Sequence, residues 1–139
     1  MRTRFAAASV ILLSASVPGF AHRLDEYLQA TMLWVEKDRV GGQIHLTPGV
    51  AAFPVVLASI DTDADGRISD AEQQVYAERV LRDLSLTVDG DGLPVRLVSA
   101  KFATTEEMKE GRGEIQLEFW ADLRPGSFTR RLIFQKSSL

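Results

Sequence analysis

The chain contains no cysteine among its 139 residues. Disulfide bridges, thiol nucleophiles and lipidated cysteine anchors are therefore excluded, and the fold must rely on its core. Positive charge does not predominate either, since 16 Lys and Arg stand against 19 Asp and Glu, for a formal net charge of −3. The sequence also lacks a basic patch with interleaved aromatic residues, so it gives no support for nucleic-acid binding.

Long apolar runs are missing as well, because the two most apolar stretches, residues 5–13 and 50–60, are too short to span a bilayer. The first stretch follows two arginines and precedes small residues up to Ala21, which is the pattern of a secretory signal. We expect residues 1–21 to be a cleaved signal peptide; an uncleaved anchor helix is the alternative. Cleavage would leave residues 22–139 as a single domain in the periplasm or outside the cell.

The most informative stretch is residues 61–72, which read DTDADGRISDAE. Aspartates at positions 1, 3 and 5, glycine at 6, serine at 9 and glutamate at 12 have the spacing of a twelve-residue calcium loop. Alternate carboxylates can turn inward around one ion, the glycine permits a sharp bend, and the last glutamate can supply both of its oxygens. The candidate ligands are Asp61, Asp63, Asp65, the carbonyl of Arg67, Ser69 and Glu72.

Four ligand carboxylates in one loop repel each other at short range, so the loop should favour a divalent cation. The alternative without a metal is an acidic surface turn with an aspartate-rich helix cap. Magnesium is a further rival, but it prefers octahedral geometry and retains its waters, whereas a bidentate glutamate suits calcium. Ile68, at loop position 8, is apolar and is expected to pin the loop to its surroundings. We therefore predict that the loop binds one Ca²⁺.

The spacing of residues 61–72 resembles the loop of the EF-hand family, which implies a helix–loop–helix unit over about residues 50–84. The incoming helix over 51–60 can have about two turns at most, because Pro54 is tolerated only in a first turn. This helix is apolar on all sides, which predicts burial. The outgoing helix is predicted over residues 70–84, with an apolar stripe at helical spacing. The residues of this stripe are Ala71, Val75, Val80, Leu81 and Leu84.

A second calcium loop is not found in the sequence. Residues 89–92, DGDG, are acidic, but no further ligands follow at the required spacing, and they lie between two strand-like runs. They are therefore predicted to form a hairpin turn. A solitary loop argues against a paired calcium sensor of the cytosolic type.

Six further segments have the composition or the alternation of β-strands. They are residues 27–36, 40–46, 84–88, 93–102, 114–123 and 128–135. We predict an α+β fold: a small antiparallel β-sheet or sandwich of about six strands joined by hairpins, with the single EF-hand unit inserted after the second strand. The aromatic residues expected to supply core bulk are Trp34, Phe53, Phe102, Phe119, Trp120 and Phe134. Among these, Trp120 is out of phase with Phe119 and could face solvent.

Outside the loop, the arrangement resembles the extracytoplasmic N-terminal region of bacterial membrane proteins related to the hydrogenase/urease-accessory nickel permease group. The segments that carry this resemblance are residues 21–27, 46–50 and 86–90, together with the calcium loop. Those relatives continue into several membrane spans, whereas this sequence stops at Leu139. The resemblance therefore implies a free-standing version of the soluble part, acting beside a membrane protein, and does not imply transport.

Histidine is scarce, with His22 and His45 as the only two. After cleavage at Ala21, His22 would offer its amine and a ring nitrogen to copper or nickel, and His45 could approach it if the first two strands pair. The alternative is that both histidines are simply exposed. Catalysis finds no support, because the serines lack a histidine or acid at a telling spacing. The acidic cluster in residues 106–110 is expected to be a solvated face, and we expect no enzyme activity.

The sequence thus predicts an exported calcium-binding domain whose ion is structural. Two other functions stay open. The first is an accessory or sensor module for a transition-metal (nickel or copper) membrane system, and the second is an interaction domain of the envelope whose surface is shaped by calcium. In both of these the partner would be a membrane or envelope protein, and the sequence does not set the oligomeric state.

Overall fold

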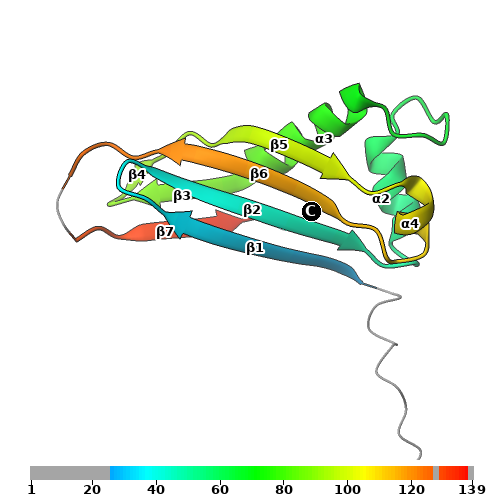
Figure 1. Ribbon diagram of the computed structural model, residues 1–139, viewed down its shortest axis with the longest axis horizontal. Coiled ribbons are helices and arrows are strands. Elements are labelled where there is room, and N and C mark those ends of the chain that lie inside the picture. The colour runs from blue at the N-terminus through cyan, green and yellow to red at the C-terminus, as the bar shows by residue number, and fades with distance from the viewer. Residues whose placement is uncertain (1–25, 127–128, 138–139) are drawn as a thin grey trace, which may run out of the picture.

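The structure, a computed structural model, describes residues 26–126 and 129–137 and has the predicted α+β class (Figure 1). The expected signal peptide, residues 1–21, and His22 lie outside the described residues. In chain order the elements are β1 (Tyr27–Val35), β2 (Arg39–Pro48), α2 (Phe53–Ile60), α3 (Asp70–Arg82), β3 (Leu84–Val88), β4 (Asp91–Gly92), β5 (Arg96–Phe102), α4 (Thr105–Lys109), β6 (Ile115–Asp122) and β7 (Leu132–Lys136). As predicted, the helical unit follows the second strand.

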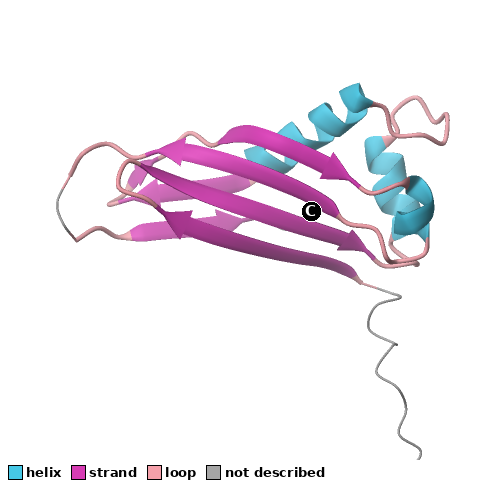
Figure 2. Cartoon of the chain, in the orientation of Figure 1, coloured by secondary structure: helices cyan, strands magenta, loops and turns pink. Residues whose placement is uncertain are grey.

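The strands form two antiparallel sheets. One has four strands in the order β1-β2-β6-β5, and the other has three in the order β4-β3-β7. The smaller sheet lies behind one end of the four-stranded sheet, and the helices gather behind its other end (Figure 1, Figure 2). The inner face of the four-stranded sheet is therefore covered along its length, while no described element covers its outer face.

The core lies along this inner face and has two parts. β6 alternates between buried and half-buried side chains, as expected of a central strand with one covered face. The larger cluster packs Leu46 and Phe119 of the sheet against Ile60 and Val80 of the helices. Each such side chain contributes about 1.5–3 kcal/mol through burial. The smaller cluster, which joins the two sheets, consists of Val40, Leu86 and Ala121.

The strand predictions hold for the central strands, but the strand predicted over residues 93–102 starts later and has a different partner. Asp89 and Gly90 have φ values of 54° and 92°, so they form the predicted hairpin turn between β3 and β4. The strand predicted over residues 93–102 does not return along β3. After the two residues of β4, only the Leu93 amide still bonds β3, at the carbonyl of Leu86, and the chain then crosses at Pro94, which has no amide to donate, to form β5 in the other sheet.

The last strand is also shorter than predicted. It was expected over residues 128–135, but β7 begins at Leu132, and residues 129–131 are not part of it. β7 pairs with β3, which lies more than forty residues earlier, so its start is set by a non-local partner. Phe128 lies outside the described residues.

The two tryptophans lie on the outer face of the four-stranded sheet, so the prediction that Trp34 fills the core was wrong. Trp34 lies opposite Gly41, and a Cβ added at Gly41 would collide with the indole ring of Trp34. Trp120 packs edge-on against Trp34, with ring centroids 5.6 Å apart. The guanidinium of Arg39 lies 4.1 Å from the centre of the Trp120 ring. The pair therefore stabilises the open face of the sheet.

The helices differ from their predictions in which side they bury. α3 ends at Arg82 rather than at residue 84. Val75, placed in the predicted apolar stripe, is 57% exposed, and Ala71 is exposed too. The face that packs inward consists of Glu72, Tyr76, Ala77, Val80 and Leu81. Burial of α2 on all sides was also wrong, because Val55 is 75% exposed.

Candidate metal centre

The candidate loop joins two helices that are fixed to the core close to its ends. α2 begins at Phe53 and carries Pro54 in its first turn, where proline is tolerated. It ends at the buried Ile60, directly before the loop. Arg79 of α3 donates a 2.7 Å hydrogen bond from Nη2 to the carbonyl of Ser59, so α3 holds the end of α2. A cation at this end of a helix also complements the helix dipole.

The three aspartates of the loop lie together. One carboxylate oxygen from each of Asp61, Asp63 and Asp65 lies within 4.8 Å of the other two. Calcium binds oxygen at about 2.3–2.6 Å, so two ligands of one ion lie about 5 Å apart at most. The three carboxylates therefore fit a single cation. The spacing does not select calcium, because magnesium also binds carboxylate oxygens.

Backbone amides hold the aspartates in this arrangement. Asp61 accepts hydrogen bonds from the amides of Asp65 and Gly66 at 3.1 and 2.8 Å. Asp65 in turn accepts one from the amide of Arg67 at 2.8 Å. These local bonds wrap the loop around its own carboxylates. Gly66 has a φ of +82° and open space where a Cβ would lie, so backbone conformation rather than crowding demands glycine there.

Gathering the carboxylates changes how they bind protons. The amide of Asp65 lowers the pKa of the Asp63 carboxyl, but loss of solvent contact, the hydrogen bond with Asp61 and repulsion from Asp65 and Glu72 together raise it above its ordinary value. A raised pKa means that the folded loop disfavours this negative charge. A cation among the carboxylates would remove the repulsion, so the electrostatics favour binding of a positive ion.

Glu72, the expected bidentate ligand, is placed differently. Its Oε1 accepts hydrogen bonds from the amide and hydroxyl of Thr62 at 2.6 and 3.1 Å. Its Oε2 accepts from the amide and hydroxyl of Ser69 at 3.0 and 2.8 Å. These donors, the Ser69 amide foremost, lower the pKa of Glu72 to about 2. The carboxylate of Glu72, at the last position of the loop, is thus bonded to Thr62, at the second position. It lies beside the three-aspartate cluster and not within it.

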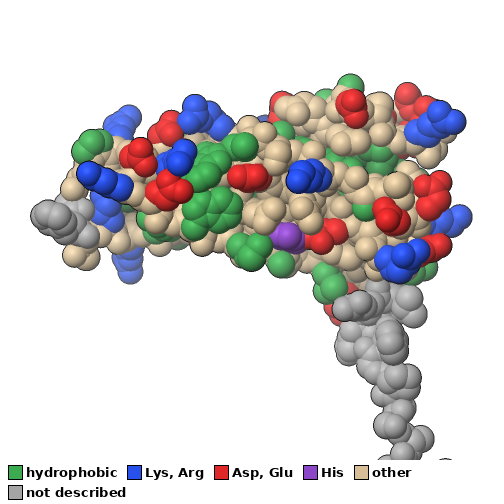
Figure 3. Space-filling model, in the orientation of Figure 1, with side chains coloured by type: hydrophobic (Ala, Val, Ile, Leu, Met, Phe, Trp, Pro, Cys, Tyr) green, Lys and Arg blue, Asp and Glu red, His purple; other side chains and the backbone are tan. Residues whose placement is uncertain are grey.

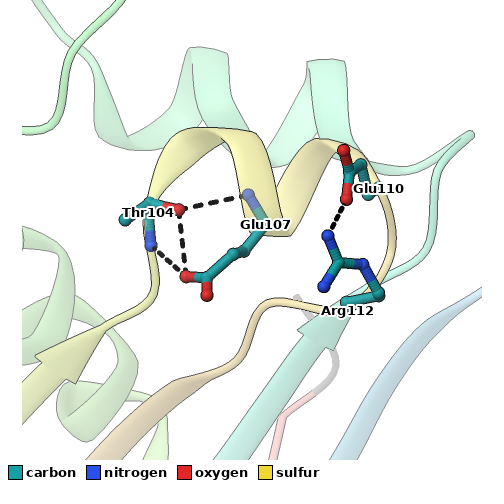
Figure 4. A network of polar contacts seen from close by, with 4 residues as sticks. All are labelled: Thr104, Glu107, Glu110 and Arg112. Carbon is teal, nitrogen blue, oxygen red and sulfur yellow. Dashed lines mark hydrogen bonds and ion pairs between the residues drawn. The ribbon is translucent and has the colours of Figure 1, made fainter.

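The contacts of Glu72 follow from helix capping. Ser69 and Glu72 form a capping box at the start of α3, in which each side chain bonds the backbone of the other. The same motif occurs at the start of α4, where Thr104 and Glu107 bond each other in a segment without calcium spacing (Figure 4). The Thr104 amide is the main cause of a lowered pKa at Glu107. The sequence analysis did not assign Ser69 and Glu72 to a capping box, although the Ser-x-x-Glu motif indicates one.

The remaining loop residues are placed as follows. Ile68 is half buried and packs against the larger core cluster, which confirms its predicted role in pinning the loop. Arg67 and Ser69 are both exposed. The Ser69 hydroxyl is directed to Glu72 and not to the aspartates. Among the expected ligands, the structure therefore brings together the three aspartates and leaves Ser69 and Glu72 as a pair beside them.

Of the other candidate groups, Lys109 in the cluster of residues 106–110 lines the same pocket as Asp61 and Gly66 of the loop. His45 on β2 bonds Glu114 through Nδ1, and its Nε2 is buried without a hydrogen-bond partner among the described residues. Because His22 lies outside the described residues, the expected approach of the two histidines stays a prediction. In the acidic cluster of residues 106–110, the glutamates are exposed, and Glu110 pairs with Arg112 (Figure 4).

No family model, curated protein or solved structure matches the chain. Within residues 26–126 and 129–137, none of the helices combines the length and the apolar character that crossing a bilayer demands.

Proposed function

We propose that this protein is an exported calcium-binding domain in which the loop of residues 61–72 holds one ion. The observation that carries the proposal is the convergence of Asp61, Asp63 and Asp65, whose oxygens lie within 4.8 Å of each other at the sequence spacing of a calcium loop. The Arg67 carbonyl, a water on Ser69 and the Glu72 carboxylate would complete the shell.

The role of the ion in this proposal is structural. Support comes from the raised pKa of Asp63, which reflects loss of solvent contact, the hydrogen bond with Asp61 and, after these, the repulsion between carboxylates that a cation would relieve. It also comes from the attachment of the loop to two packed helices through Ile60 and the bond between Arg79 and the Ser59 carbonyl. Binding would offset two of the four negative charges of the ligand carboxylates and fix the relation of α2 to α3. Outside the cytoplasm calcium is abundant, and a site with a Kd of about 10⁻⁴ to 10⁻³ M would be filled there.

Calorimetry and thermal unfolding test the proposal directly. Calcium at ten times its Kd should stabilise the protein by about 1.4 kcal/mol, which raises the melting temperature by roughly 5 °C in a domain of this size. Magnesium at the same concentration should have a much smaller effect. If calcium produces neither heat of binding nor a rise in melting temperature over chelator, the proposal is wrong.

The chain offers a matched pair of variants for this experiment. Glu72→Gln keeps a residue that can form the capping box but removes the charge and the bidentate ligand, so calcium affinity should fall about ten-fold or more. Glu107→Gln makes the same change in the capping box of α4, which has no calcium spacing, and should leave the affinity unchanged. Equal affinity in the two variants would remove Glu72 from the shell and leave a site of aspartates alone.

A further inference from the structure

β1 is an edge strand, and no strand of the described part of the chain pairs with its other side. It ends the order β1-β2-β6-β5, and no described strand lies beyond it. The chain has nine residues here, YLQATMLWV, which span about 30 Å. None of the nine is charged, and none is proline. An edge of this kind is a ready template for pairing with another strand.

The other strand edges of the described chain carry features that discourage pairing. β5, at the opposite edge of the same sheet, contains Arg96 and Lys101, follows Pro94 and has a register shift between Leu97 and Ser99. In the smaller sheet, β4 has two residues and β7 has five, which end in Lys136. Charges, bulges and short length all protect an edge. β1 has none of these, so it is singled out as the edge suited to pairing.

The register with β2 identifies which backbone groups of β1 are free. Bonds at the two ends of the pair run from the Gly49 amide to the Glu26 carbonyl and from the Glu36 amide to the Arg39 carbonyl. Antiparallel pairs alternate between bonded and non-bonded residues, so the even-numbered residues of β1 bond β2. The amides and carbonyls that point to the free edge belong to Tyr27, Gln29, Thr31, Leu33 and Val35.

We propose that two copies of this chain pair through β1, antiparallel about a two-fold axis at Thr31, and so join their four-stranded sheets into one. In this register Tyr27 faces Val35 of the other copy, Gln29 faces Leu33 and Thr31 faces itself. The first two pairings occur twice because of the two-fold axis, so there are five residue pairs. Together they exchange about ten backbone hydrogen bonds. The strand is thus complementary to itself, as a two-fold interface requires.

The outer side chains of β1 fit this pairing. Leu28 and Met32 lie on the outer face of the sheet and are 45% and 52% exposed. In the proposed register Leu28 faces Trp34 of the other copy and Ala30 faces Met32. Hydrophobic side chains already gather on this face (Figure 3), and the second copy extends that surface across the junction. At the ends Glu26 meets Glu36, whose charge is paired with Arg39 at 2.7 Å.

Sedimentation of the purified chain tests the proposal. Mass spectrometry of the same sample identifies its N-terminal residue. The interface is small, so a monomer–dimer transition is expected between about 1 and 100 µM. The amides of Gln29, Thr31 and Leu33 should gain protection from hydrogen exchange as concentration rises, while those of Ala30 and Met32 should be protected throughout. A chain that stays monomeric over this range overturns the proposal.

Two variants at the same exposed positions test the register. Ala30→Glu with Met32→Glu places like charges opposite each other across the junction and should weaken the dimer about ten-fold or more. Ala30→Glu with Met32→Lys places opposite charges there and should leave the dimer near the strength of the unsubstituted chain. Neither position is in the core, and circular dichroism verifies the fold. A dimer that responds equally to both variants overturns the proposed pairing.

Discussion

At the scale of single residues, the carboxylate of Glu72 has one observed role, in the capping box, and one proposed role, as a calcium ligand. In the capping box its oxygens accept four hydrogen bonds, from Thr62 and Ser69. As the last ligand of the proposed calcium shell it would turn the same oxygens to the ion. Because the capping bonds already hold the side chain beside the aspartates, its rotamer is restricted before any ion arrives. An ion that takes these oxygens must displace their capping hydrogen bonds, so the observed and the proposed contacts of Glu72 compete.

Gly66 allows a prediction about the loop backbone. Its φ of +82° lies in the left-handed region, where a residue with a Cβ costs about 1–2 kcal/mol. Gly66→Ala should lower the free energy of unfolding by this amount in urea titrations with chelator present. Gly92→Ala is the control, since Gly92 also has open space but not a positive φ. Equal losses in the two variants would contradict the conformational explanation.

The sequence predicted that the aspartates converge, but it did not predict the contacts around them. Alternation of the aspartates predicted that their side chains converge, and three oxygens do lie within 4.8 Å. The pattern considers only metal ligands, so it assigned Glu72 to the ion and ignored the competing donors. Thr62 was missed because the second position of a calcium loop carries no required residue type. Its contribution depends on how the loop closes, which spacing alone does not determine.

At the scale of elements, the phase of α3 shows why the apolar stripe was misjudged. Ala71 and Val75 are apolar and four residues apart. Residues of the inward face have the same spacing, so spacing alone does not show which face is buried. Tyr76 has a polar hydroxyl and was left out of the stripe, yet it is buried. Its hydroxyl lies 2.6 Å from that of Tyr27 on β1. The partner that makes a buried tyrosine acceptable comes from another element, so the helix alone does not reveal its inner face.

This tyrosine pair predicts how stability depends on pH. Burial, foremost, raises the pKa of both Tyr27 and Tyr76 above the ordinary value of 10.0. A group with a raised pKa in the fold contributes its full stability below pH 10 and loses it as pH rises through the folded pKa. The free energy of unfolding should therefore fall above about pH 10. Urea titrations from pH 8 to 11 measure this loss.

The reference for this experiment is the double variant, Tyr27→Phe with Tyr76→Phe, which removes both titrating groups. It should show a weaker alkaline loss than the unsubstituted chain. At pH 8 either single variant should cost about 1 kcal/mol or more, because it leaves one half-buried hydroxyl without its partner. An identical pH profile for the double variant would assign the alkaline loss to other groups.

At the scale of the whole molecule, the class of fold was predictable and the division into two sheets was not. Alternation along β6 and the hairpin of β1 and β2 are local signals, and they were predicted correctly. The pairing of β3 with β7 joins segments far apart in the chain, and the only local cue at Pro94 is the loss of one donor. Non-local pairing of this kind leaves little trace in sequence. The crossing from β4 to β5 therefore became visible only in the structure.

The position of the two tryptophans gives the protein a built-in optical reporter of one surface. Both lie on the outer face of the four-stranded sheet, whereas the loop joins the helices behind it (Figure 1). Tryptophan emission should therefore stay unchanged when calcium is added. It should shift as the chain is diluted from about 100 to 1 µM, because Trp34 meets Leu28 of the other copy in the proposed pairing. A calcium-dependent shift would show that the loop and the far face of the sheet move together. Fluorescence thus tests the two proposals separately in one sample. We expect the emission to respond to assembly and not to the ion.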